Sequence, residues 1–250
     1  MSSLVFTALS SYFLLAEFSS LLFLFLSIFY VSIALLCDTI VGTYLCRFHM
    51  IITKSLAWHH LPKTAGTTTE SLFLTSGLEL LWNDPQTSYL KHLPPKEHPD
   101  ASRLPLSGQH PLLNFRRLPH WLLSNYHHKQ NRMGLQLDKA PMRNGLFWRN
   151  RMHEWLPADW WLHRLSVDSS WSFLRVECLK NDFLKCLSKY ECISPLAHIR
   201  IRLVASRNRN AYDRSLRAWF TNHDLKQAYE ANPLWASFEE SVYGSLIHFH

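Results

Sequence analysis

Cysteine is scarce in this chain of 250 residues, and its spacing fits no metal or disulfide framework. The five thiols form no CxxC pair and no short-period pattern, which disfavours a structural zinc site and a disulfide-rich scaffold. Internal repeats, helix-turn-helix patterns and zinc-finger patterns are also missing, and the basic residues are scattered instead of forming a stripe. Nucleic-acid binding is therefore disfavoured. The cysteines are Cys37, Cys46, Cys178, Cys186 and Cys192.

Acidic residues are the minority among the charged ones. The chain has 26 Lys and Arg against 19 Asp and Glu, a formal net charge of +7. One of the basic residues (Arg47) and two of the acidic ones (Glu17, Asp38) lie in residues 1–49, so residues 50–250 carry 25 against 17, or +8. A basic domain suits an anionic ligand. Without nucleic-acid motifs, a small anionic cofactor is the simplest expectation.

Charge is absent altogether from residues 19–37, SSLLFLFLSIFYVSIALLC. About 20 such residues span a hydrocarbon core as a helix. No Lys or Arg precedes this run, whereas Arg47 and Lys54 follow it, so the positive-inside rule predicts a single-pass membrane protein with the domain at 50–250 in the cytoplasm. A cleaved signal peptide would need a basic leading region. Alternatively, Met50 is the true start and the domain is cytoplasmic without an anchor.

Residues 50–250 alternate between short apolar runs and segments of helical periodicity, which indicates the α/β class with a central parallel sheet flanked by helices. A break in one long helical pattern is expected at Pro157. Residues 83–119 hold seven of the twelve prolines, and loops this long are usually functional or disordered. The expected strands are 51–61, 112–115 and 171–177, and the expected helices are 67–75, 118–129, 148–165, 181–190, 216–220 and 224–244.

The most informative stretch is HHLPKTAGTTTESLF, residues 59–73, which lies between the first expected strand and the first helix. Loop N–H groups and a helix N-terminus point the same way in such a unit, so it is typical of an anion site. The phosphate-loop consensus GxxxxGK(S/T) is not matched, because Lys63 precedes Gly66 by three residues. A magnesium-dependent phosphotransferase is also disfavoured, since residues 116–124 contain no Asp or Glu.

The nine residues His-Leu-Pro-Lys-Thr-Ala-Gly-Thr-Thr at 60–68 resemble the HIPKTAGTS signature of the carbohydrate-type sulfotransferases. That resemblance implies a P-loop-like nucleotide-binding fold, 3'-phosphoadenosine-5'-phosphosulfate (PAPS) as cofactor, no metal, and a hydroxylated acceptor that we expect to be a saccharide. It also implies that Lys63 contacts the sulfate and its bridging oxygen, while loop N–H groups and hydroxyls hold the phosphate. The loop residues so implied are Lys63, Thr64, Ala65, Gly66, Thr67 and Thr68.

A second stretch, NFRRLPHWLLSNY, is similar to the RNPYDRxxS segment of the same family, in which an Arg and a Ser eight residues later bind the 3'-phosphate. Arg116 and Ser124 have this spacing. Pro119 lies one place late and Trp121 replaces the second Arg, so Arg117 stays an alternative to Arg116.

Two other segments extend the likeness over most of residues 51–244. FLRVECLKNDFLKCL at 173–187 resembles the RFENLxxDF strand-to-helix stretch, and NPLWASFEESVYG resembles the family's ending. In the basic loop that follows Ser206, Arg207 together with Arg209 is expected to close over the 3'-phosphate, as a C-terminal loop does in related enzymes.

Transfer to a hydroxyl needs a base that titrates near the operating pH, which favours His. His110 is the first expectation, because it ends the proline-rich loop and precedes the second strand. Glu70 is an alternative, since the resemblance implies a His base in some family members and a Glu base in others. The other histidines near the two loops are His59, His60, His92 and His98.

Two functions of different class follow. In the first, the chain transfers a sulfuryl group from PAPS to a hydroxyl, with Lys63 neutralising charge on the leaving phosphate without a metal. In the second, which the altered RRLPHW stretch motivates, the chain is a non-catalytic, membrane-tethered module that binds a nucleotide or another polyanion.

Overall fold

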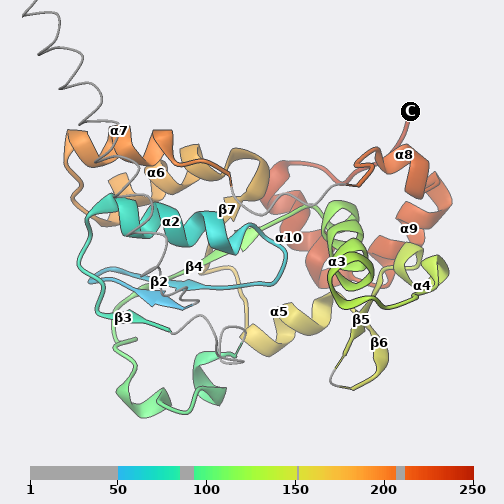
Figure 1. The fold of residues 1–250 in the computed structure, drawn as a ribbon, viewed down its shortest axis with the longest axis horizontal. Helices are drawn as coiled ribbons and strands as arrows, with labels where there is room; N and C mark the ends of the chain where they lie inside the picture. The colour runs from blue at the N-terminus through green and yellow to red at the C-terminus, as the bar shows by residue number, and fades with distance from the viewer. Residues whose placement is uncertain (1–49, 85–92, 151, 207–211) are drawn as a thin grey trace, which may run out of the picture. The chain divides into compact units, whose positions relative to one another are not determined.

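A five-stranded sheet crosses the middle of the domain, with its strands in the order β3-β1-β2-β4-β7 (Figure 1). The chain divides into two compact units, residues 1–46 and 47–250, and everything described belongs to the second. Within the described ranges no helix is long and apolar enough to cross a bilayer, and the uncharged run at 19–37 lies outside them. The computed structural model describes residues 50–84, 93–150, 152–206 and 212–250.

The sheet is mixed, which corrects the expected parallel one. Strands β2 (Leu56–His59), β4 (His110–Phe115) and β7 (Ser172–Arg175) run parallel, whereas β1 (Ile51–Ile52) pairs antiparallel with both β2 and β3 (Trp82–Asn83). The expected strand at 51–61 is therefore a hairpin. Its polar Thr-Lys-Ser turn interrupts the apolar run, and the N–H of Thr53 donates to the Leu56 carbonyl at 2.9 Å.

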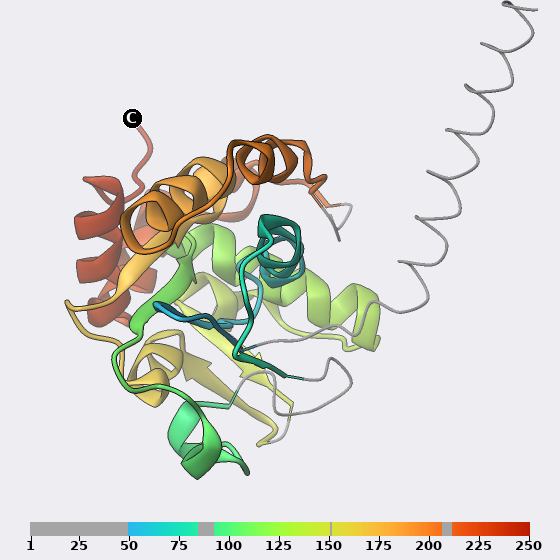
Figure 2. The ribbon, with the colours of Figure 1, turned by 90° about the vertical axis from the view of Figure 1, so that its left-hand side faces the viewer.

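Each face of the sheet has its own apolar core, because successive strand residues point to opposite faces. Trp58, Leu112 and Leu174 pack with one group of helices, and Leu113 and Phe115 pack with the other. Figure 2 shows the first group side by side over one face. These helices are α2 (Gly66–Ser76), α6 (Leu179–Tyr190) and α7 (Pro195–Leu203). The others are α3 (Leu118–Met133), α4 (Lys139–Arg143), α5 (Asp159–Leu165), α8 (Leu216–Trp219), α9 (Asn222–Glu230) and α10 (Pro233–Tyr243).

The helix expected over 148–165 is wrong in its first part. Instead, β5 (Leu146–Arg149) and β6 (Glu154–Pro157) form an antiparallel pair, in which Trp148 lies opposite Trp155. A short run of large apolar residues is compatible with a strand as well as with a helix, so periodicity alone does not separate the two. The break expected at Pro157 is confirmed, since α5 begins after it.

Candidate anion-binding site

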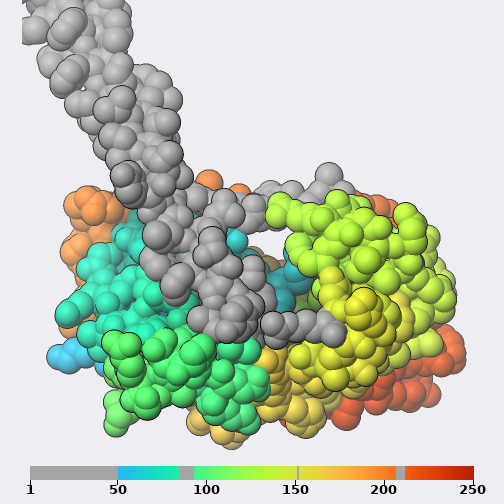
Figure 3. All heavy atoms as spheres, turned by 60° about the horizontal axis from the view of Figure 1, so that its bottom comes forward, coloured from blue at the N-terminus to red at the C-terminus, as the bar shows by residue number. Residues whose placement is uncertain are grey.

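The loop that joins β2 to α2 lies at the carboxyl edge of the parallel strands. Strand β2 ends at His59 and α2 begins at Gly66, while the neighbouring β4 ends directly before Arg116. Arg116 Nη1 donates to the Lys63 carbonyl at 3.4 Å, so the two expected ligands lie together. Ligands of open α/β sheets bind at this edge. In Figure 3 a hollow opens beside the yellow-green atoms of α3 and α4, with blue-green atoms at its depth.

The backbone of the loop is shaped as an anion nest. Lys63 (φ 66°) and Ala65 (φ 63°) are both left-handed, and Gly66 then starts α2. Left-handed residues alternating with right-handed ones turn successive N–H groups into one concavity, which the N-terminus of α2 extends. Each left-handed non-glycine residue costs of order 1–3 kcal/mol and needs support from its surroundings.

That support comes from the loop carbonyls, which are held by hydrogen bonds at five consecutive residues. The donors belong to the loop itself, to α2, and to the segment from the end of β4 to the start of α3. Within the loop and α2, the Leu61 carbonyl accepts a hydrogen bond from Thr64 Oγ1 (2.6 Å), and the Ala65 carbonyl accepts from the N–H groups of Thr68 and Thr69 (2.9 and 3.1 Å). From outside, Trp121 Nε1 donates to the Pro62 carbonyl (2.7 Å) and Asn114 Nδ2 donates to the Thr64 carbonyl (2.6 Å). Arg116 donates to the Lys63 carbonyl, as described above. With its carbonyls engaged, the loop presents its N–H groups to a ligand.

Gly66 is required by the close approach of His60. A Cβ added to Gly66 would lie 2.0 Å from His60 Nε2, far inside van der Waals contact. The His60 ring in turn stacks on Trp58, with centroids 5.6 Å apart. The glycine of the sequence signature therefore lets the helix start pack directly against the strand end.

Lys63 lies in a cluster of cations. Burial, and after it the charges of Arg132, Arg116 and Lys129, lower the pKa of the Lys63 ammonium to about 8. Burial also lowers the pKa of Lys129. The Nε of Arg116 is buried without a partner among the described residues. Four cations gathered around an N–H nest, with one donor unsatisfied, match an anionic ligand of more than one charge.

Arg116 and Arg117, the two alternatives for the 3'-phosphate ligand, make different contacts. Arg117 Nη1 pairs with the buried carboxylate of Glu239 at 3.2 Å and donates to the Ser245 carbonyl at 2.9 Å, and its guanidinium lies over the ring of Tyr243. Arg117 thus fastens the C-terminal segment to the start of α3. Arg116 is the one that faces the loop.

Ser124 lies on α3 and is buried, at 6% exposure. His120 is one turn before it on the same helix face. Burial and then the charge of Arg116 lower the pKa of His120, and Arg214 contributes as well. Arg116 is therefore close enough to both Lys63 and His120 for its charge to lower the pKa of each.

The sequence reasoning missed Lys129, Arg132 and His120. A signal existed for Lys129, which follows Trp121 by eight residues on the helix predicted over 118–129, whereas Arg132 lies beyond that predicted end, on the part of α3 that the structure adds. Trp121 donates to the loop at Pro62, which puts its side of α3 toward Lys63.

His110, the first choice for the base, is not brought to the loop, which corrects that expectation. It is the first residue of β4 and pairs with Leu56, the first residue of β2, so it lies at the opposite edge of the sheet. Strand geometry separates the two edges by on the order of 10 Å. His110 Nε2 instead meets Ser172 Oγ at 2.8 Å, and its ring stacks on Tyr190.

Two other histidines serve packing. Burial lowers the pKa of His59 to about 4, and its ring lies against Trp171. His98 engages both ring nitrogens, with Nε2 3.0 Å from Asp84 and Nδ1 accepting from the N–H of Asp100, and so locks its own loop.

The candidates that do lie at the loop are His60, beside Gly66, and Glu70, which is buried one turn into α2. His92, Arg207 and Arg209 lie outside the described residues. Within the described residues, no group of three or more His, Cys, Asp or Glu could hold a metal ion. Comparisons with protein-family models, curated proteins and solved structures found no match for the chain.

Proposed function

We propose that the domain binds PAPS at the β2–α2 loop and transfers its sulfuryl group to a hydroxyl of an acceptor, which we expect to be a saccharide. The observation that carries the proposal is the N–H nest at residues 63–66 surrounded by Lys63, Arg116, Lys129 and Arg132. The signature in the sequence supplies the chemical class. The geometry supports an anion at the place where that signature requires one.

The residues fit such a cofactor. The nest and the N-terminus of α2 suit its 5'-phosphosulfate. The unsatisfied buried Nε of Arg116 suits a second phosphate, which Ser124 and His120 on α3 would help to hold. A P-loop-like fold is part of the proposal, while the architecture itself is α/β with a mixed sheet.

PAPS would supply the activated sulfuryl group. Lys63 is protonated at neutral pH, because its pKa is about 8, so its ammonium can neutralise charge that develops on the bridging oxygen. Arg116 and the N–H groups hold the phosphate in line. His60 and Glu70 are the residues at the loop that could take the acceptor proton.

The test is transfer of labelled sulfate from PAPS to a panel of saccharide acceptors by the full chain. Lys63→Ala should reduce turnover by about 10²–10³-fold, as loss of one preorganised donor does. The matched control is Lys226→Ala. Lys226 is exposed, and its ion pair is with Glu230, one turn along the same helix. Full activity in Lys63→Ala with an unchanged control would refute the assignment of Lys63.

A non-catalytic polyanion-binding module is the second candidate. It is favoured by His110 lying at the far sheet edge and by Trp121, which packs on Pro62 at the position where the family pattern has a second Arg. This function predicts cofactor binding without product from any acceptor. Detection of sulfated product would remove it.

A further inference from the structure

Helix α7 presents an apolar stripe to solvent. Its buried residues Ala197 and Ile201 face α2 and α6, four residues apart. On the other side Leu196, Ile199 and Leu203 are 54%, 56% and 77% exposed. Their spacing of three and four residues places them in one row along the helix.

This stripe is concentrated compared with the rest of the surface. Three of the seven exposed large apolar residues of the described chain lie in these nine residues, whereas the other four are scattered as Leu74, Leu81, Met133 and Met152. Single exposed apolar residues need no explanation, but a contiguous row marks a surface that contacts something.

The surroundings of the stripe are basic. Residues 192–206 contain no Asp or Glu, and Arg200 and Arg202 alternate with the apolar residues of α7. The outward face of α7 thus combines an apolar row with cationic flanks, the two features by which a surface helix is attracted to an anionic lipid interface. The apolar row of a helix that packs in a protein core is buried, whereas this row is exposed.

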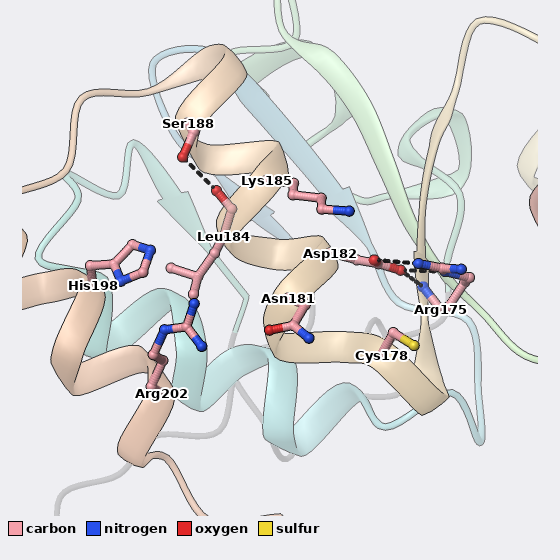
Figure 4. A pocket seen from close by; sticks show the side chains of 9 residues that line it. All are labelled: Arg175, Cys178, Asn181, Asp182, Leu184, Lys185, Ser188, His198 and Arg202. Atoms are coloured by element: carbon pink, nitrogen blue, oxygen red, sulfur yellow. Dashed lines mark hydrogen bonds and ion pairs between the residues drawn. The ribbon is translucent and has the colours of Figure 1, made fainter.

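A groove of about 430 Å³ between α6 and α7 borders this face (Figure 4). His198 and Arg202 project from α7 toward it, and Lys185 lines it from α6. Among the described residues, ion pairs engage none of these three, while the groove's one carboxylate, Asp182, is taken by Arg175 at 2.8 Å. The groove therefore offers two cations, Lys185 and Arg202, and the ring of His198 as a hydrogen-bonding group for phosphate.

We propose that α7 docks the domain on an anionic lipid surface, with the stripe in the headgroup boundary and Lys185, His198 and Arg202 on lipid phosphates. A second copy of the chain fits this face poorly, because a symmetric contact would bring Arg200 and Arg202 against their own copies. Lipid is the partner that combines apolar depth with negative charge. The uncharged run at 19–37 independently suggests that the chain meets a bilayer.

The experiment measures amide hydrogen exchange of the full chain reconstituted in phosphatidylcholine vesicles, with and without phosphatidylserine. Exchange over 195–203 should slow when phosphatidylserine is present and recover at high salt, because docking supports this short helix and attraction to lipid charge is screened. Equal exchange in both vesicles would overturn the proposal. So would protection that grows with protein concentration and not with phosphatidylserine, because it would indicate a second copy.

Two variants sharpen the test. Lys185→Glu with Arg202→Glu, and separately Leu196→Ser with Ile199→Ser, should each abolish the lipid-dependent slowing. Met152→Ser is the matched control, since Met152 is 52% exposed between β5 and β6 and lies outside α6 and α7. Exchange over α3 reports in each sample that the domain is folded. Slowing retained in both double variants would contradict the proposal.

Discussion

Asn114 ties the end of β4 to the anion loop: its side-chain amide donates to the Thr64 carbonyl at 2.6 Å and also to the Thr69 hydroxyl. Its Oδ1 accepts from Trp58 Nε1 at 2.9 Å, and the residue is fully buried. One side chain thereby joins two strands, the loop and the first turn of α2. It holds the Thr64 peptide in place between the two positive-φ residues of the loop.

Asn114→Asp should weaken binding of 3'-phosphoadenosine-5'-phosphate and lower stability. The carboxylate keeps the shape but loses both donors and faces the Thr64 carbonyl, so about 1–3 kcal/mol of unfolding free energy should be lost. Chemical denaturation and calorimetry measure the two effects. Asn181→Asp is the control, since Asn181 is exposed on α6, and equal behaviour of the two variants would contradict the role of Asn114.

Gly66→Ala should be destabilising by about 1–3 kcal/mol, as overpacking usually is, because its Cβ meets the His60 ring. The double variant with His60→Ala should recover much of this loss, since the clash is removed. Thermal unfolding of the two single variants and the double variant gives the coupling between the sites. Strictly additive effects would show that the clash is not the cause.

Affinity for the bisphosphate should fall as pH rises through about 8. Lys63 in the ligand-free protein loses its proton there, and a bound anion favours the charged form, so binding takes up a proton. Calorimetric titration from pH 7 to 9 measures this. Lys63→Arg, which stays charged throughout, should remove the decline, and an unchanged decline in that variant would assign it to another group.

Lys63→Met should stabilise the ligand-free protein. The folded-state pKa of about 8 lies below the usual 10.5, so the unfavourable charge burial is fully present below pH 8 and is lost as pH rises toward 10.5. The gain should be on the order of 3 kcal/mol near pH 7 and vanish above about pH 10. Denaturation at both pH values measures it, with the exposed Lys226→Met as a control without gain.

His110→Gln should leave bisphosphate affinity unchanged, because His110 lies at the amino end of β4 and contacts Ser172 and Tyr190. A loss of stability of about 1 kcal/mol is the expected effect. A loss of affinity comparable to that of Arg116→Ala would show that His110 reaches the site after all.

The loop was predictable because its parts are consecutive in the chain. A β-branched run, small residues around Lys63 and Gly66, and a helical pattern are local signals, and the structure has α2 where they place it. The same locality predicted α3 and α6. The cation cluster was only half visible, since Lys129 and Arg132 reach Lys63 through the packing of α3 on the loop.

The wrong predictions concern the direction of strands and the pairing between them, which are not local features of the sequence. His110 was chosen for its position beside a loop, although parallel strands place the start of β4 away from the end of β2. Trp148 and Trp155 were assigned to one helix, and only their cross-strand pairing distinguishes the strand pair. Helix α7, with its outward apolar row, carried no sequence expectation.

The most direct measurement is calorimetric titration of the full chain with 3'-phosphoadenosine-5'-phosphate, compared with ATP and magnesium, in wild type, Lys63→Ala and Arg116→Ala. The PAPS assignment predicts tight binding of the bisphosphate, much weaker binding of ATP, and a loss of at least about tenfold in each variant, in line with a charged hydrogen bond. Failure of a folded wild-type protein to bind the bisphosphate would contradict the proposed site.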